Sequence, residues 1–307
     1  MNTYSRIRRA LDSPVLFLRH VNRLYHRRLG TRDCNTSGTY IFEEDWDSLL
    51  ILDACRYDMF ERRSELPGQL ESRVSRGSAT TEFLSANLNG RDLRDTVYVT
   101  ANPQFYQNQE TIDTTFHKVI QVWQREGWDE EYGTVLPETV TKYANRAAEQ
   151  YPNKRLLVHY MQPHYPFIDS ATQFDKQHLT GEDRTGNVWD KLITGEIDIS
   201  PDEIWRMYED NLDRALPHIE KLMTELDGKT VVTGDHGNMV GERSSPIAIS
   251  EWGHPRGMYT PELVTVPWLV FENGPRREIR ADDPSTDTEN VSSDVVAERL
   301  RDLGYAE

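Results

Sequence analysis

An acidic residue and a histidine stand side by side at the end of a predicted strand, in the stretch KTVVTGDHGNMVGE at 229–242. The β-branched run before them is typical of a buried strand, and Gly234 ends it just before Asp235 and His236. Open α/β sheets bind ligands at this end of their strands, so the carboxylate and the imidazole could hold a metal ion. The alternative interpretation is a capping aspartate and a surface histidine in a loop.

A second aspartate ends the continuous apolar run DSLLILD at 47–53. Such a run is expected of a strand that is covered on both faces in a parallel sheet. Asp53 could therefore supply a further ligand, although an aspartate at this place also commonly caps a helix. Arg56 follows and could direct its guanidinium at an oxyanion. Cys55 stands among acidic residues, which raise the pKa of a thiol, so we interpret it as a small buried residue and not as a nucleophile.

Hydroxyl groups precede a helical pattern in SRGSATTEFLSANL at 75–88. Gly77 permits a tight turn, and the N-terminus of a helix favours both a nucleophile such as Ser78 and the anion that it attacks. The alternative is a capping box, in which a hydroxyl caps the helix and a glutamate follows a few residues later.

Histidines occur in two further loops. The predicted strand RLLVHY at 155–160 leads into QPHYPF, where two prolines hold His164 in place. His164 could donate a hydrogen bond to an ester oxygen or a proton to a leaving group. We interpret His159, inside the strand, as a core residue. His254 stands in the loop EWGHPRG at 251–257.

The remaining pattern predicts an α/β fold. Further strands are predicted at 96–101 and 265–271, and helices at 137–151, 200–227 and 291–305. The polar residues 170–200 predict a surface excursion near the site. This order of elements predicts one domain at 33–307, with a doubly wound, mostly parallel central sheet and helices on both faces.

The first 32 residues differ from the rest of the chain in charge. They carry eight arginines against one aspartate, whereas the whole chain has a net charge of −16. Residues 1–32 predict a basic amphipathic helix, which either lies peripherally on an anionic membrane surface or docks on the acidic body. The acidic body makes a nucleic acid an unlikely partner.

Two sparse residue types bear on the environment of the chain. Lysine accounts for only seven of the 35 basic residues, and together with the acid excess this predicts adaptation to high salt, a halophilic habitat. The chain has only two cysteines, Cys34 and Cys55, and nothing resembles a cleavable signal peptide. A cytoplasmic location is the resulting expectation.

Taken together, these segments predict a metal site. Asp53, Asp235 and His236, with His254 nearby, offer oxygen and nitrogen ligands that suit Mn, Zn, Mg or Ca. A divalent metal ion that bridges Ser78 would lower the pKa of its hydroxyl and polarise a bound ester oxygen.

The runs ILDACRYD, GSATTEF, QPHYPF, TGDHGNMVGE and WGHP resemble the sulfatase-like branch of the alkaline phosphatase superfamily, which includes phosphoglycerol transferases. The resemblance covers residues 45–305. It implies that Asp53, Asp235 and His236 are metal ligands and that Ser78 is the nucleophile. It also implies that His164 contacts the transferred group, with Arg56 assisting, and that His254 is a further metal-binding or substrate-binding residue.

The chain departs from the sulfatase pattern in informative places. Counted from Ser78, it has Thr80 where sulfatases have proline and Glu82 where they have arginine. We therefore expect an unmodified hydroxyl nucleophile in place of formylglycine, which favours phosphate over sulfate esters. The register leaves Thr80 and Thr81 open as alternatives to Ser78. Sulfatases also carry paired aspartates where Asp53 is followed by Ala54, so we expect a single metal ion.

The resulting hypothesis is a metal-dependent hydrolase or transferase that acts on phosphate or sulfate esters, including esters linked to glycans or lipids. It would use a serine or threonine nucleophile. The alternative is a non-catalytic relative that serves as a scaffold at the membrane surface.

Overall fold

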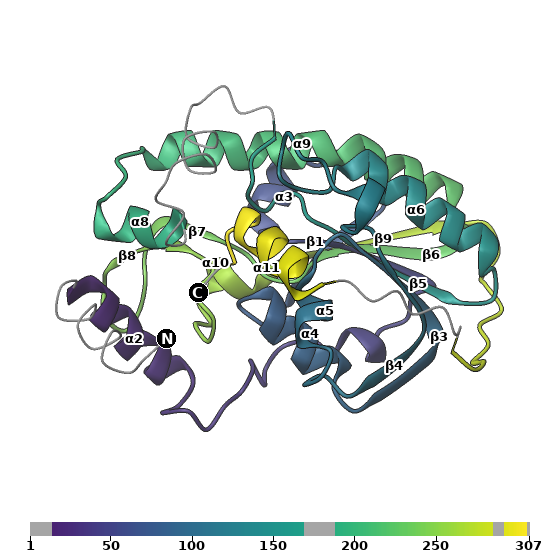
Figure 1. Ribbon diagram of the computed structural model, residues 1–307, viewed down its shortest axis with the longest axis horizontal. Coiled ribbons are helices and arrows are strands. Elements are labelled where there is room, and N and C mark those ends of the chain that lie inside the picture. The colour runs from purple at the N-terminus through teal and green to yellow at the C-terminus, as the bar shows by residue number, and fades with distance from the viewer. Residues whose placement is uncertain (1–13, 169–187, 285–291, 306–307) are drawn as a thin grey trace.

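A computed structural model of the chain describes residues 14–168, 188–284 and 292–305 (Figure 1). The strands are β1 (Ser48–Leu52), β2 (Gln69–Val74), β3 (Arg91–Thr100), β4 (Thr114–Gln121), β5 (Arg155–Tyr160), β6 (Gly228–Gly234), β7 (Met239–Arg243), β8 (Ser250–Gly253) and β9 (Thr265–Asn273). The helices are α2 (Pro14–His26), α3 (Tyr57–Arg63), α4 (Thr80–Leu88), α5 (Gln104–Asn108), α6 (Pro137–Gln150), α8 (Val188–Thr194), α9 (Pro201–Glu225), α10 (Pro261–Val264) and α11 (Ser293–Asp302), with 3-10 turns at Ile41–Glu43 and Arg125–Gly127.

The main sheet has seven strands in the order β2-β9-β6-β1-β5-β3-β4. Neighbouring pairs among β6, β1, β5, β3 and β4 are parallel, whereas β9 runs antiparallel to both β6 and β2. The predicted fold class, a mostly parallel α/β sheet, is confirmed. Because β1 lies between β5 and β6, the ends of these three central strands meet at one edge of the sheet, where a ligand site is expected.

Helices cover both faces of the sheet, and each face has its own core. One core packs α3, α6 and α9 against the sheet through side chains such as Phe60, Ala144 and Leu212. The opposite core includes Phe83 and Leu84 from α4. The central strand β1 is buried at all five positions, because it contributes to both cores, and this explains its unbroken apolar sequence.

Several elements differ from the sequence prediction. The strand predicted at 96–101 begins earlier, at Arg91, and β2 and β4 were not predicted at all. Most of β2 is exposed at the edge of the sheet, so its polar sequence carries no core pattern. Residues 250–253, predicted as part of a loop, form β8, which pairs with β7 in a separate two-stranded sheet. The excursion predicted at 170–200 falls mostly outside the described residues.

The described part of the basic N-terminal segment is a helix that docks on the body. Arg19 of α2 bonds to Glu251 and to Asp190, and the buried amide of Asn22 bonds to the carbonyl oxygen of Ile247. Within the described residues, no helix is long and apolar enough to cross a membrane. The division into residues 1–32 and a domain at 33–307 stays a prediction.

Candidate functional site

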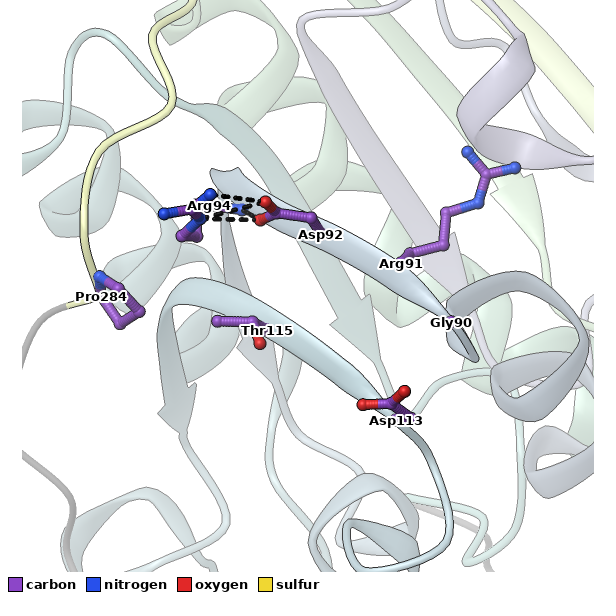
Figure 2. Close-up of a pocket in the computed structure, with 7 residues that line it drawn as sticks. All are labelled: Gly90, Arg91, Asp92, Arg94, Asp113, Thr115 and Pro284. Atoms are coloured by element: carbon purple, nitrogen blue, oxygen red, sulfur yellow. Dashed lines mark hydrogen bonds and ion pairs between the residues drawn. The ribbon is translucent and has the colours of Figure 1, made fainter.

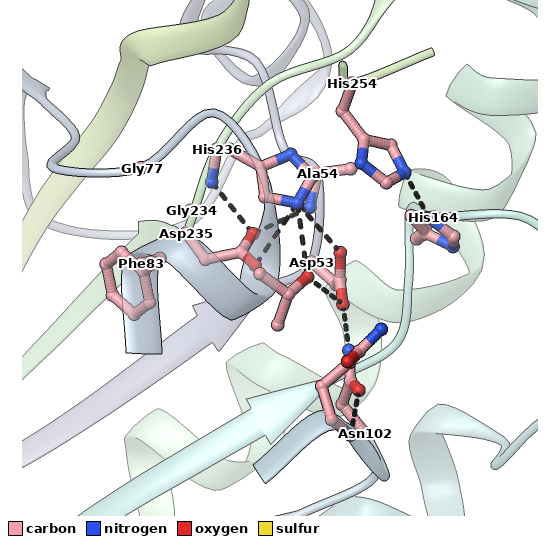
Figure 3. Close-up of polar contacts among 12 residues, drawn as sticks. Asp53, Ala54, Gly77, Phe83, Asn102, His164, Gly234, Asp235, His236 and His254 are labelled. Atoms are coloured by element: carbon pink, nitrogen blue, oxygen red, sulfur yellow. Dashed lines mark hydrogen bonds and ion pairs between the residues drawn. The ribbon is translucent and has the colours of Figure 1, made fainter. Parts of the chain in front are cut away.

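The register of the central strands brings the two predicted acidic ligands together. Leu52 at the end of β1 pairs with Gly234 at the end of β6, so Asp53 and Asp235 leave neighbouring parallel strands at the same level. Both aspartates and His236 are completely buried. Figure 3 shows the three side chains converging at this edge of the sheet.

One carboxylate oxygen of Asp235 accepts hydrogen bonds, and the other has no hydrogen-bond partner. Its Oδ1 accepts hydrogen bonds from the backbone N–H groups of Ala54, at 2.9 Å, and His236, at 2.8 Å. Ala54 is left-handed, with φ 60°, a conformation that costs a non-glycine residue about 1 kcal/mol. Asp235 Oδ2 is buried with no hydrogen-bond partner. Burial raises the pKa of Asp235, although the nearby imidazole of His159 opposes this.

Asp53 shows the same division between its oxygens. Its Oδ2 accepts hydrogen bonds from the Asn102 amide, at 2.6 Å, and the Tyr305 hydroxyl, at 2.8 Å, whereas its Oδ1 is buried without a partner. Burial, together with the neighbouring charge of Asp235, raises the pKa of Asp53 well above its usual value. Two buried carboxylates side by side are costly unless a positive charge joins them.

His236 turns a lone pair toward these free oxygens. Its Nδ1 lies 2.7 Å from the carbonyl oxygen of Gly237, which can only accept, so Nδ1 carries the proton and Nε2 is left unprotonated. Burial lowers the pKa of His236 to about 4, which keeps the ring neutral near pH 7. Gly237 is required here because a Cβ would collide with the carbonyl oxygen of Glu262.

These atoms satisfy the requirements of a metal site. His236 Nε2 lies 3.6 Å from Asp53 Oδ1 and 3.4 Å from Asp235 Oδ2. A tetrahedral ion with bonds of about 2.0 Å would separate its ligand atoms by about 3.3 Å. Within the described part of the chain, Asp53, Asp235 and His236 are the cluster of potential ligands whose atoms lie within 4.8 Å of one another. The unpartnered carboxylate oxygens therefore fit a divalent cation.

Among the hydroxyls of Ser78, Thr80 and Thr81, the one that reaches this cluster belongs to Thr80, the first residue of α4. Thr80 Oγ1 lies 3.2 Å from His236 Nε2 and 3.4 Å from Asp53 Oδ2. Ser78 Oγ instead accepts hydrogen bonds from the backbone N–H groups of Gly257, at 2.8 Å, and Met258, at 3.3 Å. Ser78 also bonds to Glu82 through both its N–H and its hydroxyl group. The structure thus brings Thr80, and not Ser78, to the cluster.

Two histidines predicted from separate loops meet beside the cluster. His164 Nε2 and His254 Nε2 are 2.9 Å apart, and the His254 ring lies 4.6 Å from that of His236. Burial lowers the pKa of His164 to about 3, and it also lowers that of His254, so both rings are neutral near pH 7. His164 Nδ1 bonds to the carbonyl oxygen of Tyr165, which leaves its Nε2 as the acceptor. His254 then donates from Nε2.

Sequence reasoning missed three residues near the cluster. His159, interpreted as a core residue, is buried with Nε2 unpartnered and 3.8 Å from both Asp53 Oδ2 and Asp235 Oδ2. Its place near the end of a strand beside β1 was the available signal. Asn102 likewise follows the end of a predicted strand. Tyr305 was expected only as the last residue of an amphipathic helix.

Arg56 is not brought to the cluster. Its guanidinium forms ion pairs with Asp58 and Glu242, bonds to the carbonyl oxygen of Asn238 and lies over the ring of Trp205. Cys55, expected to be a buried thiol, is fully buried, and burial raises its pKa.

A separate cavity lies at the other end of the sheet. Figure 2 shows its lining, and its volume is about 470 Å³. Its charged groups largely pair locally, since Arg94 bonds to Asp92 and the Arg91 guanidinium lies over the Tyr40 ring. The cavity is lined by Gly90, Arg91, Asp92, Arg94, Asp113, Thr115 and Pro284. It belongs to the starts of β3 and β4, away from the metal-site residues.

Comparison with known proteins gives structural matches only. No family model and no curated protein matches the chain. The C-terminal periplasmic domain of EptC from Escherichia coli, in complex with Zn, matches with 13% identity and a TM-score of 0.46 over 75% of this chain and 74% of that one. An alkaline phosphatase superfamily protein from Vibrio parahaemolyticus matches with 11% identity and a TM-score of 0.43, over 87% and 69%. A phosphonate monoester hydrolase from Silicibacter pomeroyi matches with 14% identity and a TM-score of 0.41, over 83% and 72%.

These matches agree with the resemblance seen in the motifs, since they include a protein of the alkaline phosphatase superfamily. At such identities and TM-scores the matches do not establish the activity of this chain, which has to be argued from its own side chains. The expected cytoplasmic location is wrong, because the matching domains from Escherichia coli and Campylobacter jejuni are periplasmic. That expectation depended only on the small number of cysteines and on a sequence in which no signal-peptide pattern was recognised. The expected high-salt habitat stays a prediction.

Proposed function

We propose that this chain is a metal-dependent enzyme that transfers or hydrolyses the phosphoryl group of phosphate esters, with Thr80 as its nucleophile. The observation that carries the proposal is the convergence of Asp53 Oδ1, Asp235 Oδ2 and His236 Nε2 beside the Thr80 hydroxyl. The two carboxylate oxygens present lone pairs that no described donor uses, and the unprotonated His236 Nε2 has only the Thr80 hydroxyl beside it. Such a set of oxygen and nitrogen lone pairs suits a divalent cation.

The protein would hold one divalent ion through Asp53, Asp235 and His236. Such an ion lowers the pKa of an adjacent hydroxyl and polarises an ester oxygen. Thr80 is placed to be that hydroxyl, since its Oγ1 is 3.2 Å from His236 Nε2. Its position at the first turn of α4 also puts the positive end of the helix dipole beside a bound phosphate.

The reaction would proceed in two steps, transfer of the phosphoryl group to Thr80 and then to an acceptor. Thr80 Oγ1 loses its proton and forms a bond to phosphorus, while the bond from phosphorus to the leaving oxygen breaks and that oxygen gains a proton. An acceptor hydroxyl, from water or an alcohol, then gives up its proton and takes the phosphoryl group. Thr80 Oγ1 is released and regains a proton.

We assign to His164 and His254 the role of binding the transferred phosphoryl group. Their Nε2 atoms face each other at 2.9 Å, the His254 ring lies 4.6 Å from the His236 ring, and the two rings are neutral near pH 7. In the neutral pair the proton between the rings sits on His254 Nε2, and His254 would donate it to a phosphoryl oxygen that replaces His164 Nε2 as the acceptor, so neither ring becomes charged.

Phosphate is a better candidate than sulfate for this site. Counted from Thr80, the formylglycine pattern would require a proline at Glu82 and an arginine at Leu84, so this chain lacks it and an ordinary threonine is the better candidate for the nucleophile. A non-catalytic scaffold is the alternative. It would have no need for two buried, unpartnered carboxylate oxygens, whose desolvation is costly.

We also propose that a lipid-linked phosphate ester is the substrate and that residues 1–32 contact an anionic membrane. Four large apolar side chains are exposed in the described residues, and Phe17, Tyr25 and Leu29 of this segment are three of them. The same segment bonds through Arg19 to Glu251 of β8, directly before the loop of His254. Docking on the body thus keeps this exposed face close to the site.

The test uses protein stripped with EDTA and reloaded separately with Mn, Zn, Mg or Ca. Aryl phosphate monoester, diester and sulfate substrates are then compared. We expect at least one ion to restore phosphate ester cleavage, and Thr80→Ala and Asp235→Ala to abolish it. Thr81→Ala is the matched control and should stay active. Failure of every ion to bind or to restore turnover would favour the scaffold, and faster cleavage of the sulfate would reject a phosphate substrate.

A further inference from the structure

Tyr305 enters the candidate site from a remote part of the chain. Its hydroxyl lies 2.8 Å from Asp53 Oδ2, 3.0 Å from the amide nitrogen of Asn102 and 3.2 Å from Thr80 Oγ1. Its ring stacks on the His164 ring, with centroids 4.9 Å apart and planes at 19°. One side chain therefore contacts a proposed metal ligand, the proposed nucleophile and a histidine assigned to the transferred group.

The local structure around Tyr305 explains why it points inward. Helix α11 ends with a left-handed Gly304, φ 75°, whose N–H bonds to the carbonyl oxygen of Arg301. The N–H of Tyr305 bonds in turn to the carbonyl oxygen of Leu300, which completes a Schellman motif. This cap reverses the chain, while buried Leu303 anchors the turn in the core. In Figure 1, α11 (yellow) lies in front of the central strands.

The outer surface of α11 is anchored as well. Arg299 forms an ion pair with Glu130, and its guanidinium lies 4.5 Å from the centre of the Trp128 ring. Val296 is buried in the main core. These contacts, together with the capped turn, hold Tyr305 in a fixed position relative to Asp53.

The hydrogen bonds of Asp53 show what the Tyr305 hydroxyl does. Asn102 and Tyr305 both donate to Oδ2 of Asp53, while Oδ1 has no partner and lies 3.6 Å from His236 Nε2. Donors that bind one carboxylate oxygen fix the rotation of the group and thereby direct the other oxygen. Loss of such an orienting partner typically costs about 10-fold to 100-fold in metal affinity or activity.

We propose that Tyr305 is a positioning residue of the metal site, whose hydroxyl acts with Asn102 to hold Asp53 so that Oδ1 faces the cation. This inference depends on the proposed function, because it assumes that Asp53 binds a metal. It makes α11, which contributes no ligand, a required part of the site. The aromatic ring has a separate effect, since it covers the face of His164.

Calorimetric titration of EDTA-stripped protein with Zn²⁺, and in parallel with Mn²⁺, tests this role. Tyr305→Phe keeps the ring and removes only the hydroxyl, so we expect metal affinity to fall about 10-fold or more. The melting temperature of the metal-free protein should stay close to that of the wild type. Tyr25→Phe, which alters an exposed phenol on α2, is the matched control and should bind as the wild type does.

Two further variants separate the inference from the proposed function. Asp53→Ala should abolish binding, and Asn102→Ala should weaken it as Tyr305→Phe does. If the wild type binds metal and Asp53→Ala does not, but Tyr305→Phe keeps wild-type affinity, the role of Tyr305 is rejected and the proposed function stands. If the wild type binds no metal, both are rejected. A loss of affinity in Tyr305→Phe that is matched by Tyr25→Phe would also overturn the inference.

Discussion

Thr80 Oγ1 lies 3.2 Å from His236 Nε2, although the two residues are 156 positions apart in the sequence. Ser78, two residues before Thr80, directs its hydroxyl to the backbone of residues 255–258 instead. Because the chain enters α4 at this point, neighbouring side chains face different parts of the molecule. A sequence motif with several hydroxyls therefore contains one candidate nucleophile and one structural residue.

Ser78→Ala should lower the stability of the protein, whereas Thr80→Ala should lower its activity. Ser78→Ala leaves the N–H groups of Gly257 and Met258 without their acceptor, so we expect the free energy of unfolding to fall by about 1–3 kcal/mol. Metal affinity should change little. Thr80→Ala should lower turnover of an aryl phosphate by about 10³-fold or more while the protein stays folded. Chemical denaturation and steady-state kinetics on both variants measure these effects.

The opposite pattern would return the nucleophile to Ser78. In that case Ser78→Ala would be inactive at normal stability, and Thr80→Ala would keep its turnover. Thr80→Ser is the conservative control, since it retains a hydroxyl at the same place and should keep part of the activity.

Arg56 is expected to matter for stability more than for chemistry. Its buried guanidinium pairs with Asp58 and with Glu242, whose side chains are 46% and 28% exposed, so its removal should cost less than the roughly 3–5 kcal/mol of a fully buried pair. We expect Arg56→Ala to lower the denaturation midpoint while the folded protein keeps its affinity for metal. A folded Arg56→Ala protein of normal stability that fails to turn over substrate would contradict this.

The same pair should make stability depend on pH. Burial alone would raise the pKa of Asp58, but the hydrogen bond and charge of Arg56 outweigh it, and the net pKa is lower than usual. The contribution of Asp58 is therefore complete above the unfolded-state pKa of about 3.9 and is lost as the pH falls through the lower folded-state value.

Asp58→Asn tests this pH dependence. Because Asp58 is partly exposed, we expect the variant to lose no more than about 1 kcal/mol of stability at pH 7. The difference from the wild type should shrink as the pH falls below about 3.9. Urea denaturation at several pH values measures it. If the difference in stability between Asp58→Asn and the wild type grew at low pH, the predicted lowering of the Asp58 pKa would be contradicted.

Membrane contact through α2 predicts a specific lipid dependence. Replacing Phe17, Tyr25 and Leu29 by serine removes exposed apolar surface without touching Arg19 or its partners. We expect the triple variant to bind less to phosphatidylcholine vesicles that contain phosphatidylglycerol, as measured by flotation. Val74→Ser, at the exposed position on β2, is the control. Equal binding of all three proteins, or none by the wild type, would reject the membrane contact.

Much of the fold could be predicted from the sequence because its signals are local. The apolar runs of β1, β5 and β6 record burial on both faces, and the acidic residues and histidines at their ends belong to the same short stretches. Asp53, Asp235 and His236 could be predicted together for this reason, since parallel strands end at a common edge. The edge strand β2 has no such pattern and was missed.

The sequence by itself determined which residue types stand at the strand ends, and hence that a divalent cation and an ester could meet there. Only the tertiary structure decided which hydroxyl faces the cluster, where the Arg56 guanidinium lies and that Tyr305 reaches Asp53 across 252 positions. The physical reason is that side-chain direction depends on backbone turns and on packing between distant elements. Neither leaves a periodic signal in a single sequence.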